Sequence, residues 1–518
     1  TDERDAGRTP TVGRPIEVPA PPAAAAADPV PPTQTSPAAP GPTILAAPRP
    51  ERAHWAYYVA LGAVAALALY LRLRDPLAST IIGAEDPYLH MERTYQLIQG
   101  DWVRDYPIGF MLLLAPFALM GPDVFCDVAR FGPAFLGTVG VVLTFFLCRP
   151  YMHPSGALTA SLLLGVIPEH IRRTDLLFPT AVDLAILPFF FLVVMKLAEG
   201  RRWAVPTLLG LTLGLLIVHP WVVALMVPPL LLFGAVELLR RRERKAVVAT
   251  GGIAGAVCVA GLFTMFRQWQ PAALFNDTIV PKVVAIANQP ALLLDLPVYV
   301  NFEWMLTWPV MVLGGVGVVL AALRHTRFNL LILFWTLLLL PLVLVDWFDV
   351  WYLPHRTVVY LALGIAILGG VTMSEIARAL EATPAKTRIP VLAGAVALVA
   401  IVMTPLALAT EPWYRLYDGD DEQAWAALEE RDTALVMTGS WQARAGYRAM
   451  TGRDATYWPD FFNDENVRNV ELRKHPDLVV LMDRHVDPNV VRDTSFLAQP
   501  DWVILGQWGD VTAYQRSA

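Results

Sequence analysis

Two acidic residues just beyond a long apolar segment are the first feature of this sequence that could do chemistry. Glu85 and Asp86 follow the apolar run Trp55–Leu73. Charges at the mouth of a membrane span are costly unless they have a function or a partner. Glu85–Tyr88 is expected to break the helix before an amphipathic helix over Met91–Ile98, so Asp86 is predicted on a turn at the membrane surface. The structural alternative is a helix cap, because Asp before Pro is a common start signal.

A second polar cluster precedes another apolar segment. Asp183 lies where that segment begins, and the loop before it contains Glu169, His170, Arg172, Arg173 and Asp175. Two carboxylates such as Asp86 and Asp183 could hold a divalent cation or accept a proton. The alternatives are a second helix cap for Asp183 and contact with lipid headgroups for the arginines.

His219 and Arg356 are candidates at other helix ends. His219 precedes Pro220-Trp221, and a lone histidine there is more often structural than catalytic. Arg356 lies at or just inside the outer end of a span, where its side chain could snorkel to the interface. Facing the bundle, it could bind a phosphate or pyrophosphate through two hydrogen bonds. An arginine beside two carboxylates suits cleavage of a phosphate–sugar bond, in which charge develops on both fragments.

The composition indicates a membrane protein. Of 518 residues 55% are hydrophobic and 17% charged, the mean hydropathy is +0.46, and a soluble chain carries about a quarter charged residues. The sequence predicts a polytopic α-helical membrane protein with about eleven spans. These are Trp55–Leu73, Val128–Cys148, Ser155–Pro168, Leu184–Leu197, Trp203–Val218, Trp221–Leu239, Ala246–Phe266, Trp304–Leu323, Phe328–Val345, Leu353–Thr372 and Pro390–Ala409. Tyr106–Met120 is short and interrupted by proline, and is expected to be re-entrant or interfacial.

Basic residues predict the orientation of these spans. The arginine- and lysine-rich loops fall between alternate pairs of spans, and such loops face the cytoplasm. The N-terminus is therefore expected in the cytoplasm and the C-terminal region outside. In this topology all the candidate site residues emerge on the outer face.

Three domains are predicted. Residues 1–50 form a Pro/Ala-rich tail that is expected to be disordered, and 51–410 form the transmembrane domain. Residues 411–518 are expected to form a small extracytoplasmic α/β domain, because charged helical sequence alternates there with short apolar strands. The predicted elements are a helix at Asp420–Arg431 and strands at Thr433–Met437, Leu478–Met482, Trp502–Gln507 and Val511–Gln515.

The chain resembles the GT-C membrane glycosyltransferases, among them the catalytic subunit of oligosaccharyltransferase and its single-subunit prokaryotic relatives. Glu85–His90 is similar to that family's first external-loop motif, whose Asp is a metal-binding catalytic residue, and this role falls to Asp86. Arg173-Thr174 followed by Asp183 resembles the second acidic motif. Arg356 matches an arginine that helps to position the substrates.

The acceptor side of the resemblance is weaker. Ser440–Tyr447 stands where the family carries Trp-Trp-Asp-Tyr-Gly, the motif that reads the Ser/Thr of an Asn-x-Ser/Thr acceptor. Trp441 and Tyr447 match this motif, whereas its second Trp and its Asp have no counterpart. Arg267–Asn301 takes the place of the family's long external loop.

The resemblance implies an enzyme that moves a sugar or oligosaccharide from a polyprenyl-(pyro)phosphate carrier to an extracytoplasmic protein, glycan or lipid. The implied catalytic residues are Asp86, Asp183 and Glu85. The implied phosphate-binding residues are Arg356, Arg173 and His219. Trp441 and Tyr447 are the implied residues on the acceptor side. Mg²⁺ or Mn²⁺ is the implied metal, held by Asp86 and Asp183. Partners are the lipid bilayer, the lipid-linked donor and the acceptor, and no nucleic acid is expected.

Two other functions remain open. An asparagine-linked oligosaccharyltransferase proper is opposed by the incomplete acceptor motif. A non-catalytic transporter or scaffold predicts internal inverted repeats and charges at mid-membrane, whereas the acids of this chain cluster at one face.

Overall fold

The computed structural model describes residues 55–78, 85–100, 108–240, 305–344, 352–409, 419–429, 436–438, 455–457, 478–482, 495–509 and 511–516. All of them belong to one compact unit, Arg52–Ala518. The predicted span Ala246–Phe266 and the predicted tail 1–50 lie outside the described residues.

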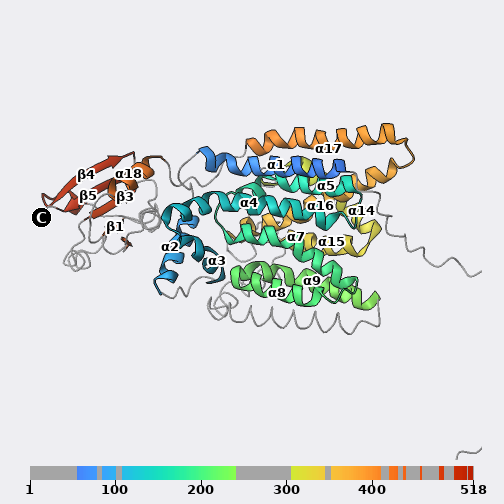
Figure 1. Ribbon diagram of the computed structural model, residues 1–518, viewed down its shortest axis with the longest axis horizontal. Coiled ribbons are helices and arrows are strands. Elements are labelled where there is room, and N and C mark those ends of the chain that lie inside the picture. The colour runs from blue at the N-terminus through green and yellow to red at the C-terminus, as the bar shows by residue number, and fades with distance from the viewer. Residues whose placement is uncertain are drawn as a thin grey trace, which may run out of the picture. The chain divides into compact units, whose positions relative to one another are not determined.

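Helices, most of them apolar, make up the first part of the chain (Figure 1). They are α1 (Trp55–Ala78), α2 (Glu85–Ile98), α3 (Ile108–Ala118), α4 (Pro122–Cys148), α5 (Pro154–Val166), α6 (Pro168–Thr174), α7 (Pro179–Ala198), α8 (Ala204–Val218), α9 (Pro220–Arg240), α14 (Trp308–Arg324), α15 (Arg327–Leu344), α16 (Tyr352–Ala379) and α17 (Ala385–Leu408). Within the described residues six are long and apolar enough to cross a membrane, namely α1, α4, α7, α9, α16 and α17. The prediction of a multi-pass helical membrane protein is thus confirmed, whereas the total of eleven spans stays a prediction.

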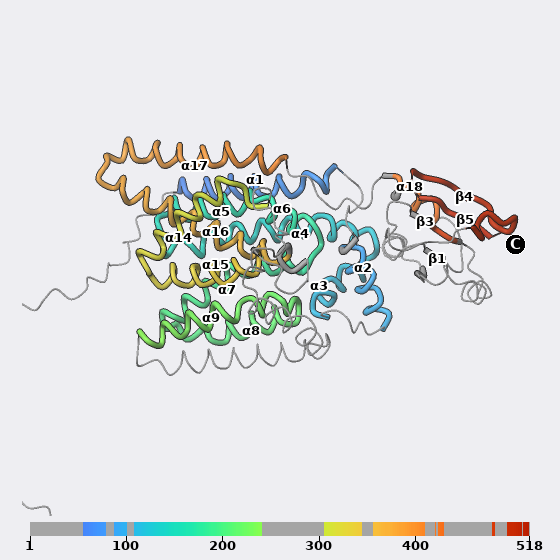
Figure 2. Tube along the Cα trace, turned by 180° about the vertical axis from the view of Figure 1, so that it is seen from behind, coloured from blue at the N-terminus to red at the C-terminus, as the bar shows by residue number. Residues whose placement is uncertain are grey.

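The long helices run side by side in one bundle, with α1 and α17 on one flank and α8 and α9 on the other (Figure 2). The central helix is α16, which packs against α5, α14 and α15. Glycines allow this close approach: a Cβ on Gly317 of α14 would lie 2.0 Å from the carbonyl oxygen of Leu368, and one on Gly156 would lie 2.4 Å from that of Gly370. Small residues are the usual means of close helix packing in membranes.

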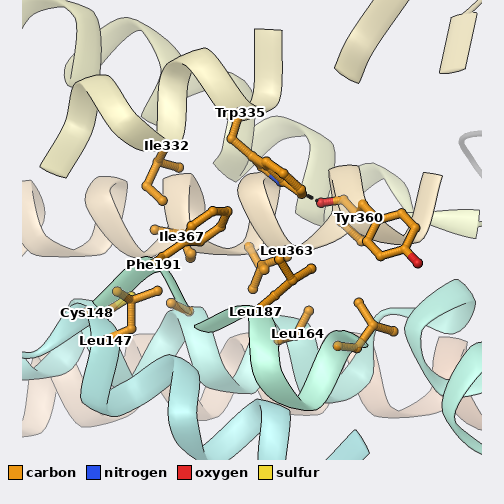
Figure 3. Packing of buried hydrophobic residues seen from close by; sticks show 14 of the residues in the cluster. Leu147, Cys148, Leu164, Leu187, Phe191, Ile332, Trp335, Tyr360, Leu363 and Ile367 are labelled. Carbon is orange, nitrogen blue, oxygen red and sulfur yellow. Dashed lines mark hydrogen bonds between the residues drawn. The ribbon is translucent and has the colours of Figure 1, made fainter. Parts of the chain in front are cut away.

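Trp335 of α15 fixes the first half of α16. Its indole Nε1 donates a hydrogen bond of 2.8 Å to the backbone oxygen of Tyr360, and Phe191 of α7 packs edge-on against its ring at 5.0 Å. Figure 3 shows these side chains within the apolar core, with the ring of Tyr360 extending away from Trp335. Three helices therefore determine where the Tyr360 hydroxyl lies.

Arg72 joins α1 to the end of α5 and to α6. The guanidinium is fully buried and donates to Thr174 Oγ1 at 2.7 Å, to the Ala68 carbonyl at 2.7 Å and to the Gly165 carbonyl at 3.1 Å. Gly165 lies in the last turn of α5, where backbone carbonyls have no partner within the helix. Arg72 thus caps α5 and holds α6 in place.

We expect Arg72→Met to destabilise the protein. The variant keeps the length of the side chain but leaves the Gly165 carbonyl without its donor, at a cost of about 2 kcal/mol, or a fall in melting temperature of about 2 °C. Arg74→Met is the control for exposure, since Arg74 lies on the same helix and makes its bonds, to Asp75 at 3.3 Å and to the carbonyl of Leu408, near solvent. Equal melting temperatures in detergent for the two variants would contradict this role.

The C-terminal region contains the predicted α/β domain. Helix α18 (Gly419–Glu429) precedes β1 (Val436–Thr438), β2 (Ala455–Tyr457), β3 (Leu478–Met482), β4 (Trp502–Trp508) and β5 (Val511–Arg516). The strand order is β2-β1-β3-β5-β4; β1 is parallel to β2 and β3, while β5 is antiparallel to β3 and β4. The sequence missed only β2 among these strands, since its three residues are too few to show an alternating pattern.

The acidic start of α2 differs from its prediction. The helix is continuous from Glu85 to Ile98, with Pro87 in its first turn, so the chain does not break there. Proline is tolerated in the first turn because those backbone N–H groups have no helical partner. Asp86 therefore lies within the first turn of α2 and not on a preceding turn. The short helix α3 agrees with the expectation that Tyr106–Met120 contains less than a full span.

Candidate active site

Asp183 is the centre of a buried polar cluster at the start of α7. Its side chain is fully buried, and its Oδ2 accepts a hydrogen bond of 2.6 Å from the hydroxyl of Tyr360. The same oxygen is hydrogen-bonded to Nδ1 of His219, which follows the last residue of α8. We refer to Asp183, His219 and Tyr360 as the Asp183 cluster. Because the carboxylate of Asp183 accepts this hydrogen bond, the proton of the His219 ring lies on Nδ1. The other ring nitrogen, Nε2, remains available to other partners.

The second carboxylate oxygen of Asp183 differs from Oδ2 in its hydrogen bonding. Oδ1 is buried and has no hydrogen-bond partner among the described residues. A buried carboxylate oxygen without a partner is costly, and such atoms in a folded protein call for an explanation beyond folding. Oδ1 is therefore an atom of this cluster that could accept a hydrogen bond or a cation from a ligand.

The polar segment before Asp183 is not an exposed loop. It forms the seven-residue helix α6, in which Arg172 is 1% exposed and Arg173 is 8% exposed. Arg173 Nε lies 2.9 Å from Glu169 Oε1, one turn earlier in the helix. Burial raises the pKa of Glu169, although both arginines act in the opposite direction. The alternative of headgroup contact by these arginines does not fit the described structure, because both side chains are buried.

His90 brings α2 to the same end of the bundle. Its ring lies edge-on to Phe110 of α3 at 5.0 Å and to Phe178, the residue before α7, at 6.5 Å. Burial, together with the charges of Arg93 and Arg356, lowers the pKa of His90 to about 3. These interactions place His90, which lies one turn after Asp86 in α2, close to the start of α7 and to Arg356.

Acid stability provides a check on this environment. Because the pKa of His90 falls from 6.5 to about 3 on folding, its contribution to stability is complete above pH 6.5 and is lost as the pH falls toward 3. Between about pH 7 and pH 4, we expect the melting temperature of the His90→Gln variant to fall by less than that of the wild type. His325→Gln, at the exposed end of α14, is the control. Parallel pH profiles for His90→Gln and the wild type would refute the assignment.

The structure places the residues predicted from sequence as follows. Asp183 and His219 are in direct contact, which the sequence did not indicate, while Arg356 is exposed on α16 one turn before Tyr360. Glu85 and Asp86 are the first two residues of α2, and their side chains lie outside the described residues, as do Trp441, Tyr447 and the segment Arg267–Asn301.

Tyr360, His90 and Arg72 were missed from the sequence. His90 lies inside the motif used for recognition, and that position was the available signal. Tyr360 and Arg72 lie in apolar segments of spanning length, where a tyrosine is common and an arginine near a helix end can snorkel. Neither residue carries a local pattern that predicts its partner.

A metal ion is the cofactor that the carboxylates of the candidate site suggest. Within the described chain no group of three or more His, Cys, Asp or Glu side chains could bind one. Asp183 offers Oδ1, and His219 offers only Nε2, because its Nδ1 is bonded to Asp183. Mg²⁺ is commonly bound by one or two carboxylates together with substrate phosphates and water. The donor set fits such an ion and does not form a complete protein cage.

No protein-family model matches this chain, and no curated protein matches it by sequence. Solved structures do match its fold. The archaeal oligosaccharyltransferase AglB from Archaeoglobus fulgidus, in complex with an inhibitory peptide and a dolichol-phosphate, aligns over 83% of this chain and 69% of its own length, with 15% identity and a TM-score of 0.53. A structure of the A. fulgidus enzyme with Zn and sulfate aligns with 15% identity and a TM-score of 0.51, over 82% of this chain and 68% of that one.

A second kind of membrane enzyme aligns as well. ArnT from Cupriavidus metallidurans, bound to undecaprenyl phosphate, covers 89% of this chain and 98% of its own, at 13% identity and a TM-score of 0.56. AglB and ArnT are both GT-C membrane glycosyltransferases, the group that the sequence motifs resemble. This chain therefore has the GT-C fold of membrane glycosyltransferases.

Proposed function

We propose that this protein is a membrane glycosyltransferase that moves a sugar or oligosaccharide from a polyprenyl-(pyro)phosphate carrier to an extracytoplasmic acceptor. The observation that carries the proposal is the Asp183 cluster at the start of α7, which His90 of α2 approaches through Phe178. A buried carboxylate with one unpartnered oxygen suits acid–base chemistry or cation binding. The GT-C fold supports this function.

The proposed reaction is a displacement at the anomeric carbon of the donor sugar. The bond from that carbon to the phosphate oxygen breaks, and a bond from the same carbon to the acceptor forms. The acceptor's proton passes to a carboxylate, for which Asp86 is our candidate, with Glu85 beside it. Polyprenyl phosphate or pyrophosphate leaves with the electron pair of the broken bond. Asp183 is the second carboxylate of the site.

Positive groups near these carboxylates support a phosphate site. Arg356 is exposed and lies close enough to His90 for its charge to act on that ring, and Arg173 acts in the same way on Tyr360. We propose Arg356 as the main ligand of the donor phosphate, with Arg173 and His219 lining the site. Arg173 would do so while its Nε remains on Glu169.

Mg²⁺ or Mn²⁺ is proposed as a cofactor. Asp86 and Asp183 would hold the ion, and when bound it would neutralise charge on the departing phosphate. The solved structure of the A. fulgidus enzyme with Zn and sulfate supports a divalent cation in this fold.

The remaining assignments are proposals about setting and partners. We propose a cytoplasmic N-terminus, with residues 1–50 as a tail, 51–410 as the membrane domain, and 411–518 as an extracytoplasmic domain that contributes Trp441 and Tyr447 on the acceptor side. The carrier's polyprenyl tail would lie in the lipid bilayer. The acceptor would be a protein, glycan or lipid.

Asparagine-linked transfer is the second candidate. The match to AglB favours it, because one of the matching structures of the A. fulgidus enzyme carries an acceptor peptide with the NVT sequon. The near-complete coverage of ArnT, whose structure contains undecaprenyl phosphate, favours a carrier with one phosphate. A labelled Asn-x-Thr peptide as the acceptor separates the two, since only the second candidate would yield a glycopeptide.

The test of the proposed function uses the full chain reconstituted in lipid vesicles. Undecaprenyl-phosphate-linked and undecaprenyl-pyrophosphate-linked labelled sugars are supplied in separate reactions, with and without EDTA, and release of the free carrier is measured. We expect release from one class of donor, reduced at least about tenfold by EDTA and restored by Mg²⁺ or Mn²⁺. Vesicles without the protein are the control. No release from any donor would overturn the proposal.

A further inference from the structure

Tyr360 contacts the candidate site without belonging to any of its sequence motifs. The residue is fully buried, and its hydroxyl donates to Asp183 Oδ2 at 2.6 Å. Its backbone oxygen is held by Trp335 Nε1 at 2.8 Å, so the main chain is fixed at the same residue (Figure 3). The hydroxyl therefore reaches Asp183 from a rigid base.

Both donors of the cluster use the same oxygen. The hydroxyl of Tyr360 and Nδ1 of His219 lie against Oδ2 of Asp183 and 3.4 Å from each other, while Oδ1 remains without a partner among the described residues. The terminal torsion of an aspartate is broad, so a single donor does not fix the plane of the carboxylate. Two donors from different parts of the chain, one in α16 and one between α8 and α9, do fix it. They also prevent Oδ2 and Oδ1 from exchanging places.

We infer that Tyr360 is a positioning residue, which holds Asp183 through Oδ2 so that Oδ1 is presented to a ligand. The inference rests on the proposed transfer reaction and specifies the chemistry of the ligand: a cation or a hydrogen-bond donor that approaches Oδ1. A neutral hydroxyl suits this role because it orients the carboxylate and leaves its negative charge in place. Partners of this kind around a catalytic or metal-binding carboxylate commonly change activity or affinity by about 10–100-fold.

A double-mutant cycle tests the inference. Tyr360→Phe, Asp183→Asn and the double variant of the full chain are assayed in vesicles with the labelled undecaprenyl-linked sugar that the wild type turns over. We expect Tyr360→Phe to lower kcat by about 10–100-fold while the KM for the donor changes by less than about twofold. In the Asp183→Asn background the same change is expected to have less than about a twofold effect, because the two residues act as a unit.

Tyr151→Phe is the matched control. The hydroxyl of Tyr151 also donates to a carboxylate, Glu199 Oε1 at 2.7 Å, next to the end of α7 opposite to Asp183. Removal of this hydroxyl is expected to leave kcat unchanged. The melting temperature of every variant is measured in parallel, and Tyr360→Phe should unfold within a few degrees of the wild type.

Three outcomes would overturn the inference. Independent effects on kcat in the cycle would mean that Tyr360 does not act through Asp183. A raised KM with kcat intact would assign Tyr360 to donor binding. A loss of activity that follows the melting temperature would assign it to packing. Failure of the proposed function is distinguishable, because the wild type itself would then turn over none of the donors.

Discussion

Asp86→Asn is expected to reduce sugar transfer by about 10²–10⁴-fold, the range for loss of a general base. The side chain keeps its size and loses its charge, so the acceptor's proton has no base and a divalent cation loses a ligand. The expectation follows from the position of Asp86 in the first turn of α2, one turn before His90, whose ring contacts Phe178 just ahead of α7. The measurement is release of the free carrier, with and without added Mn²⁺.

The competing explanation for Asp86 is helix stabilisation. An acidic residue in a first turn interacts favourably with the helix dipole, by about 0.3–1 kcal/mol. Asp123 is the matched control because it is exposed in the first turn of α4, directly after a proline. If both Asp→Asn variants lower the melting temperature slightly and neither lowers turnover, Asp86 has no role in the chemistry.

Glu85→Gln separates the two neighbouring acids. Glu85 and Asp86 are the first two residues of α2, and only Asp86 is the proposed base. We expect Glu85→Gln to reduce turnover by less than tenfold. A greater loss from Glu85→Gln than from Asp86→Asn would transfer the proposed role to Glu85.

Much of the helical architecture could be predicted, because apolar segments of spanning length have few alternative structures. Where the hydrocarbon layer excludes water, a backbone must satisfy its hydrogen bonds within the segment. The predicted span Trp203–Val218 became α8 (Ala204–Val218), and Trp221–Leu239 became α9 (Pro220–Arg240). A proline marks the start of α9, since proline is accepted at the first helical positions.

The polar contacts of the site could be predicted only in part. Glu169 and Arg173 are four residues apart, the spacing of an intrahelical ion pair, and this signal for α6 was available in the sequence. The contact of Asp183 with His219 and Tyr360 joins positions 36 and 177 residues apart. No local pattern records such pairs, because they arise from the packing of α7, α8 and α16.

The fold itself was anticipated from two short motifs, and their positions explain why. Glu85–His90 forms the beginning of α2, and Arg173–Asp183 runs from the end of α6 into the beginning of α7. His90 contacts Phe178, the residue before α7. A few side chains at helix ends can thus identify a bundle whose remaining sequence is constrained only to be apolar. This is consistent with a match to solved structures at 13–15% identity and without any match by sequence.

Arg356→Gln is expected to weaken binding of the donor's phosphate by about 10–100-fold. A charge-assisted hydrogen bond contributes about 1.5–3 kcal/mol, and each 1.4 kcal/mol corresponds to a factor of ten in affinity. Arg356 is exposed at the start of the candidate span Arg356–Ala379, one turn before Tyr360, and its charge acts on His90. The measurement is the Kd of undecaprenyl phosphate for the full chain in nanodiscs.

Arg356→Lys tests the geometry of this contact separately from its charge. Lysine keeps the positive charge but lacks the planar pair of donors that matches two phosphate oxygens, so we expect an intermediate loss of affinity. Arg378→Gln is the control for net charge, since Arg378 pairs with Glu375 near the other end of α16. Its affinity is expected to stay within about twofold of the wild type. If both variants at Arg356 bind as the wild type does, the phosphate is held elsewhere and Arg173 becomes the residue to replace.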